Sequence, residues 1–121
     1  MKIAKLALIP LALVAGSAFA TDANVTAANS SQKVTYEATD GKFVATKFDF
    51  NVSANVALKS KENETAIAVQ TANTKGRNNY SGSSEGGSVS QCGNPTTGST
   101  APSVREPVLA NANGCNAGST P

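Results

Sequence analysis

Residues Val44 to Leu58 read VATKFDFNVSANVAL, and this stretch decides the fold class. Its even-numbered positions hold apolar residues and one threonine, whereas its odd-numbered positions hold mainly lysine, aspartate, asparagine and serine. A period of two residues indicates a β-strand with one buried and one solvated face. The stretch exceeds the usual strand length of about three to ten residues. We therefore expect a bend or bulge between Asn51 and Asn55.

The residues before and after this stretch alternate in the same way. Val34, Tyr36 and Ala38 precede it, and Ile67, Val69 and Thr71 follow it. We expect an antiparallel meander of three strands that extend over about 33–38, 42–58 and 65–71.

The register of this meander decides whether its apolar side chains share one face. A three-residue loop with a left-handed Gly41 places Tyr36 opposite Val44, and the downstream pattern places Ile67 opposite Leu58. The resulting apolar face is a candidate assembly face that consists of Tyr36, Val44, Phe48, Phe50, Val52, Val56, Leu58, Ile67 and Val69. Because a one-sided sheet is not stable in water, this face must pack against another layer or another chain.

Residues 1–20 have the order of a secretory signal peptide. Two lysines precede the apolar run Leu6–Ala15, and Ala18-Phe19-Ala20 forms a small-residue cleavage site. A transmembrane helix needs roughly 20 apolar residues, so this run is too short to be one. We expect export through the inner membrane of a bacterium to the periplasm, cell surface or exterior, with no integral membrane segment left after cleavage.

The charge balance argues against two classes of partner. The chain has ten basic and eight acidic residues, and loss of Lys2 and Lys5 with the signal peptide leaves eight of each sign. A neutral chain offers no basic stripe for nucleic acid and no polybasic cluster for anionic lipid. We expect neither as a partner.

The two cysteines, Cys92 and Cys115, are predicted to form a disulfide, because export leads to an oxidising compartment. The closed loop of about 24 residues would contribute roughly 3 kcal/mol by chain-entropy arithmetic. A redox pair or a metal site is the less favoured alternative, since the chain has no histidine and no C-x-x-C spacing.

The expected fold class is all-β, a small antiparallel sheet or sandwich with a loop-rich, disulfide-bonded C-terminal region. The expected parts are a signal peptide at 1–20, a polar N-terminal segment at 21–32, the β meander at 33–71, a Gly/Ser/Asn-rich loop or linker at 72–103, and a C-terminal strand and disulfide loop at 104–121. The strand is expected at Val104–Ala110, at an edge because of Pro107. Two covers for the apolar face stay open. Either Val25, Val104, Val108 and Leu109 close a small sandwich, or the chain assembles with copies of itself or a partner strand.

The sequence offers no set of residues for catalysis. Without histidine, neither a Ser-His-Asp nor a Cys-His constellation can form. No two of the carboxylates stand out as a catalytic pair. The Gly-rich run 81–88 has neither the lysine nor the strand-to-helix context of a phosphate-binding loop. We expect no enzyme activity, no cofactor and no metal.

An exported chain rich in alanine, asparagine and threonine, with alternating apolar residues, is similar in a general way to bacterial fimbrial and other surface-fibre subunits. A free strand edge and a thin core also favour a structural or assembly protein of the cell surface, completed by a strand of a second copy or of another exported β protein. The alternative is a small monomeric periplasmic or secreted binding module, an adhesin or inhibitor, that binds through the 72–103 loop or the polar sheet face.

Overall fold

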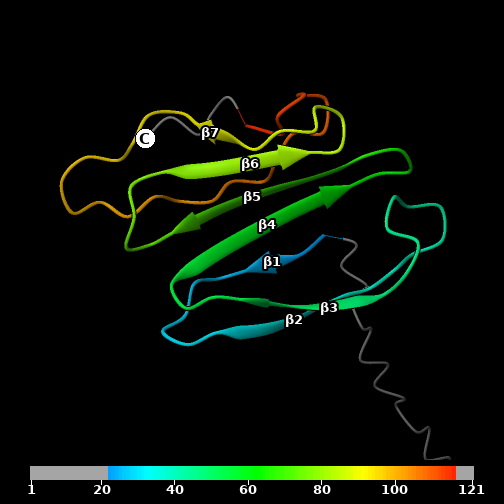
Figure 1. Cartoon of the computed structure of the whole chain (residues 1–121), viewed down its shortest axis with the longest axis horizontal. Helices are drawn as coiled ribbons and strands as arrows, with labels where there is room; N and C mark the ends of the chain where they lie inside the picture. The colour runs from blue at the N-terminus through cyan, green and yellow to red at the C-terminus, as the bar shows by residue number, and fades with distance from the viewer. Residues whose placement is uncertain (1–21, 117–121) are drawn as a thin grey trace, which may run out of the picture.

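Figure 1 shows the computed structural model, which describes residues 22–116. Within these residues the chain is all-β, without a helix, and forms two antiparallel sheets. The strands are β1 (Asn24–Val25), β2 (Gln32–Tyr36), β3 (Phe48–Val52), β4 (Val56–Glu62), β5 (Ile67–Asn73), β6 (Asn79–Ser83) and β7 (Ser90–Cys92). The predicted all-β class and the predicted Cys92–Cys115 disulfide are confirmed. The expected signal peptide, residues 1–20, lies outside the described residues.

The larger sheet has five strands in the order β1-β4-β5-β6-β7, and the smaller sheet pairs β2 with β3. Strands β4 to β7 follow one another as a meander, while the N-terminal β1 pairs with the outer side of β4. In Figure 1 the β2–β3 pair lies next to β1, at the end of the molecule opposite β7.

A corner at Ser53–Asn55 divides the long strand expected at 42–58. The backbone of Asn55 is left-handed, with φ 64°, a conformation that asparagine tolerates better than most residues. Its amide donates to the Ala28 carbonyl at 2.6 Å, and its carbonyl accepts from the Thr74 amide at 2.8 Å. The bend predicted between Asn51 and Asn55 is therefore present, but it moves the chain from one sheet to the other. The predicted meander within a single sheet is wrong in this respect.

Both predicted registers are wrong by four residues. Tyr36 lies opposite Phe48 and not Val44, and Leu58 lies opposite Thr71 and not Ile67. The first hairpin has a long connection at 37–47, whereas the turn between β4 and β5 is tight and closed by the Asn63 side chain, which accepts from the Ala66 amide at 2.8 Å. Because an even shift keeps every residue on its side of the sheet, the apolar residues of each hairpin still share a side. The single apolar face predicted for residues 33–71 is nevertheless divided between two sheets.

The interior lies between the apolar sides of the two sheets. Tyr36 and Val52 of the small sheet are buried there with Val25 of β1. The Tyr36 ring stacks on Phe48 with centroids 5.4 Å apart. Aromatic pairs of this kind add about 0.5–1.5 kcal/mol to the free energy gained by burial.

Residues 94–116, here called the C-terminal strap, cross β5 and β6 (Figure 1). The strap is joined to β7 through the disulfide, and the Asn79 side chain donates to the Ser103 carbonyl at 2.6 Å. Pro107, within the strap, is fully buried. The strand predicted at Val104–Ala110 does not form, because a segment that contains proline packs on the sheet face and not along an edge.

The segment 72–103, expected to be a loop or linker, contains β6 and β7. Strand β6 pairs with β5 over five residue pairs and with β7 over three. Its sequence, Asn-Tyr-Ser-Gly-Ser, has a single large apolar side chain, so the backbone ladder and not an apolar period defines it.

Candidate assembly surface

The five-stranded sheet has two chemically different faces, because residues directly opposite each other in an antiparallel ladder point to the same side. We call the side that carries Val69 the apolar face and the side that carries Gln70 the small-residue face. The apolar face holds Val25, Val56, Leu58, Ser60, Glu62, Ile67, Val69, Thr71, Tyr80 and Gly82. The small-residue face holds Ala57, Lys59, Lys61, Ala68, Gln70, Ala72, Asn79, Ser81, Ser83 and Cys92.

The small sheet and the 37–47 connection cover the part of the apolar face over β1 and β4. Ser60 Oγ donates to the Tyr36 hydroxyl at 3.4 Å. The Val44 amide donates to Glu62 Oε2 at 3.0 Å, and Val25 is buried beside them. This end of the face is therefore closed by the chain itself.

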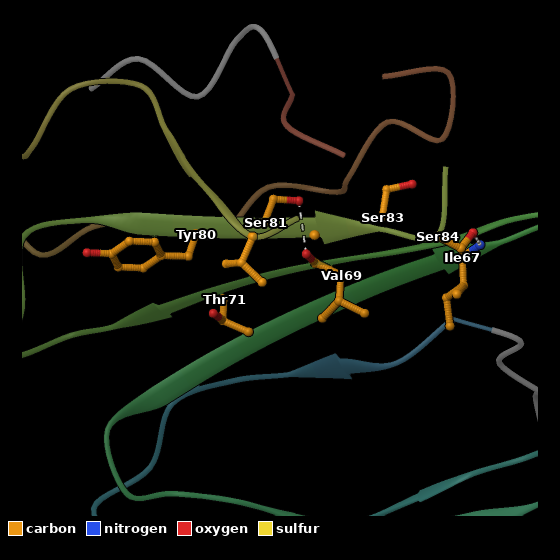
Figure 2. A pocket seen from close by; sticks show the side chains of 9 residues that line it. Ile67, Val69, Thr71, Tyr80, Ser81, Ser83 and Ser84 are labelled. Carbon is orange, nitrogen blue, oxygen red and sulfur yellow. Dashed lines mark hydrogen bonds between the residues drawn. The ribbon is translucent and has the colours of Figure 1, made fainter. Parts of the chain in front are cut away.

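The part of the apolar face over β5 and β6 is open. It forms a groove of about 350 Å³ lined by Ile67, Val69, Thr71, Tyr80, Ser81, Gly82, Ser83, Ser84 and Val89, here called the apolar groove. Tyr80 is 44% exposed and Val89 is 76% exposed. In Figure 2, Val69, Thr71 and Ile67 point to one side of the sheet, whereas Ser81 and Ser83 point to the other.

The floor of the apolar groove is low at Gly82, because this residue has no side chain. A β-carbon added there would lie 3.4 Å from Val89 Cγ2, which is an ordinary van der Waals distance. Tyr80, two residues earlier on the same strand and the same face, protrudes beside this hollow. The groove thus combines one protruding aromatic ring with one hollow.

Most polar groups of the apolar groove already have partners. Ser81 Oγ donates to the Val69 carbonyl at 2.9 Å, and Ser84 Oγ accepts from the Ile67 amide at 3.1 Å. No residue in the lining is an aspartate, glutamate, lysine or arginine. The groove is therefore suited to an uncharged, largely apolar surface.

A second hollow of about 280 Å³ adjoins the groove at the β5–β6 turn and shares Thr71 and Tyr80 with it. Its further lining residues are Val56, Ala72, Asn73, Gly76, Arg77 and Asn78. The Arg77 Nε donates to the Thr96 carbonyl at 2.8 Å, so the strap orients this guanidinium. This hollow is the more polar of the two sites.

The structure distributes the nine residues of the predicted assembly face over four places. Tyr36, Val52, Phe48 and Phe50 lie on the small sheet, on the side that faces the interior. Val44 lies in the 37–47 connection, and Val56 and Leu58 lie on β4. Ile67 and Val69 lie in the apolar groove.

Sequence reasoning missed Tyr80, Gly82 and Val89, the other main residues of the apolar groove. They fall in the segment expected to be a loop, where serine and glycine between them hide the alternation. Tyr80 could have pointed to this surface, since it is the only aromatic residue in the sequence between Phe50 and the end of the chain.

Ion pairs lie on the outer side of the small sheet and between the two ends of the 37–47 connection next to it. Lys33 Nζ lies 2.8 Å from Asp49 Oδ2, and Lys47 Nζ lies 2.9 Å from Glu37 Oε1. The hydrogen bond from Lys33 lowers the pKa of Asp49, and the hydrogen bond to Glu37 raises the pKa of Lys47. These groups are exposed, so their contribution to stability is small. They form a solvated surface.

Two features are absent from residues 22–116. In this part of the chain, no three histidine, cysteine, aspartate or glutamate residues are grouped so that they could hold a metal ion. No helix there combines the length and apolar character needed to span a bilayer. Comparisons with protein-family models, with curated proteins and with solved structures found no match.

Proposed function

We propose that this chain is an exported structural or assembly protein of the bacterial cell surface, a fibre or matrix subunit that associates through its β structure. The observation that carries the proposal is the half-covered apolar face. The small sheet closes it over β1 and β4, but Ile67, Val69, Tyr80 and Val89 still line an open groove. Contiguous exposed apolar surfaces of this kind mark interaction sites.

Open strand edges support the same proposal. Among the described residues, β2 and β3 each pair with a strand on one side only, and β7 ends the five-stranded sheet. Unpaired edges accept a strand from a second copy or from another exported β protein. Assembly of many copies into a fibre would use these strand edges.

The signal-peptide pattern of residues 1–20 supports export, and the Cys92–Cys115 disulfide is compatible with an oxidising compartment. The periplasm, the cell surface and the exterior all meet this condition.

The test is the mass in solution of oxidised residues 21–121, measured by light scattering over a wide concentration range, with negative-stain microscopy of the same samples. Mass that rises with concentration, or fibres on the grid, is the expected result. A compact monomer at every concentration would overturn the proposal.

A small binding module, such as an adhesin or inhibitor, is the alternative function. The hollow at the β5–β6 turn favours it, since Arg77, Asn73 and Asn78 offer hydrogen-bonding groups beside the Tyr80 ring. Neutral and acidic sugars screened against the monomer test this function. Arg77→Ala and Tyr80→Ala should each abolish a binding signal from this hollow, whereas Lys33→Ala, on the small sheet, should leave it intact.

A further inference from the structure

We infer that the occupant of the apolar groove is the same groove of a second copy of this chain. The two copies would be related by a two-fold axis, with each Tyr80 seated in the hollow over Gly82 of the other. This inference rests on the proposed function and names the partner and the contact surface.

Charge is the first argument for a second copy. The lining contains no charged side chain, so a charged partner would lose hydration there without gaining an opposite charge. The same groove on a second copy is equally uncharged and meets this condition. Residues 21–121 carry eight basic and eight acidic residues, so no net charge drives the copies apart.

Shape is the second argument. Tyr80 and Gly82 lie two residues apart on one face of β6, and one protrudes where the other leaves a hollow. A two-fold axis that lies between the two copies, parallel to the sheet and perpendicular to β6 at the level of Ser81, brings each Tyr80 over Gly82 of the other copy. Each copy then supplies one ring and one hollow, which is the self-complementary arrangement that a two-fold interface requires.

The chemistry of the lining disfavours other occupants. The groove lies on the face of β5 and β6, and both strands are already paired on each side, so an added strand would find no backbone partners there. A sugar would need several convergent polar groups, yet the hydroxyls of Ser81 and Ser84 already bond to the backbone. Side-chain packing is what this surface offers.

Two variants test the contact from its two sides. Tyr80→Glu places a carboxylate where the ring should be buried, and Gly82→Val fills the hollow. The position of Gly82 leaves ordinary contact distance for a β-carbon, and β-branched residues favour strands. Gly82→Val should therefore fold, and the exposed Val89 side chain can turn away to make room for the added γ-methyl groups. We expect each variant to weaken self-association at least tenfold in the dimer dissociation constant, measured by sedimentation velocity.

Phe43→Glu is the matched control, because Phe43 is 44% exposed, as Tyr80 is, but lies in the 37–47 connection away from the groove. Its association should equal that of the unmodified chain. Circular dichroism and thermal melting confirm that each variant is folded.

The outcomes separate the inference from the proposed function. If the unmodified chain is monomeric at all concentrations, both fail. If it assembles and Tyr80→Glu and Gly82→Val assemble equally well, the inference is wrong while assembly through strand edges stands. Equal loss in Phe43→Glu would also overturn the inference, since the effect would then come from added charge alone. If Gly82→Val does not fold, the comparison of the dimer dissociation constants of Tyr80→Glu and Phe43→Glu tests the inference.

Discussion

Ser60 on β4 donates a hydrogen bond of 3.4 Å to the hydroxyl of Tyr36 on β2, and this contact joins the two sheets in the interior. Tyr36 is only 3% exposed. Burial raises the pKa of Tyr36, and the nearby carboxylates of Glu62 and Asp22 act in the same direction. The Tyr36 hydroxyl therefore favours its neutral form as long as the sheets stay together.

Tyr36→Phe should reduce the free energy of unfolding by about 1 kcal/mol or more, because it removes the hydroxyl that bonds to Ser60 in the interior. The pH dependence should change as well. Since the folded-state pKa is raised above 10.0, the unfolded chain loses this proton first, and stability falls as pH rises through and above that value. The variant should show a smaller alkaline loss in urea unfolding followed from neutral to alkaline pH.

Tyr80→Phe serves as the control for this prediction, since it keeps Tyr36 and should keep the alkaline loss. An equally steep alkaline loss in Tyr36→Phe would show that another group is responsible.

The alternation in residues 44–58 predicted which side chains share a face, and it did so because the side-chain period of a strand is two. An error of four residues in the register of each hairpin did not change which side of the strand each residue was assigned to, because four is an even number. Alternation cannot reveal a corner in the chain when the apolar residues keep the same period of two on both sides of that corner. On both sides of Asn55 the even-numbered residues point to the interior, so the sequence looks like one strand although the chain changes sheets there.

The part of the candidate surface on β6, and the strap that covers the other face of this strand, could not be predicted from the sequence for a different reason. Strand β6 is made of serine, glycine, asparagine and one tyrosine, a composition that is typical of loops. Its partner on the small-residue face is an irregular strap anchored by Pro107, Gly114 and a disulfide. Small side chains on the sheet allow this close approach, but neither partner has a period that sequence reasoning can detect.

Gly114→Ala should destabilise the fold, because the strap presses Gly114 against β5 and β6. Its φ is +73°, and an added β-carbon would lie 2.8 Å from Ser81 Oγ and 3.1 Å from Ala68 Cβ. Left-handed strain and overpacking together should cost about 2–4 kcal/mol. Chemical denaturation of the oxidised protein measures the loss.

Gly98→Ala is a matched control within the same strap. Its φ is +63°, but no heavy atom lies within 4 Å of the added β-carbon. Its cost should be limited to about 1–2 kcal/mol of backbone strain. Equal losses in the two variants would contradict the close packing of Gly114 on the sheet.

Removal of the disulfide in Cys92→Ala/Cys115→Ala should lower the free energy of unfolding by about 3 kcal/mol, since the closed loop no longer restricts the unfolded chain. Hydrogen exchange of β5 and β6 should also become faster, because the strap that covers their small-residue face loses its anchor at Cys115. A reducing agent should reproduce the effect in the unmodified chain and add nothing in the double variant. Unchanged exchange would show that the strap holds its place without the disulfide.

Gln70→Met should stabilise the protein, although Gln70 is the largest fully buried side chain of the sheet. The residue is 0% exposed, and neither its Nε2 nor its Oε1 has a hydrogen-bond partner within the described residues. An unsatisfied buried amide costs about 1–3 kcal/mol, and methionine has a similar shape without that cost. We expect a gain of about 1–2 kcal/mol in urea unfolding.

Gln70→Ala separates packing from polarity, because it removes the amide but leaves a cavity under the strap, and it should lose stability. Neither change should alter self-association, since Gln70 lies on the small-residue face, opposite the apolar groove. If Gln70→Met instead lost more than about 1 kcal/mol, the amide would have to bond a group such as an ordered water under the strap.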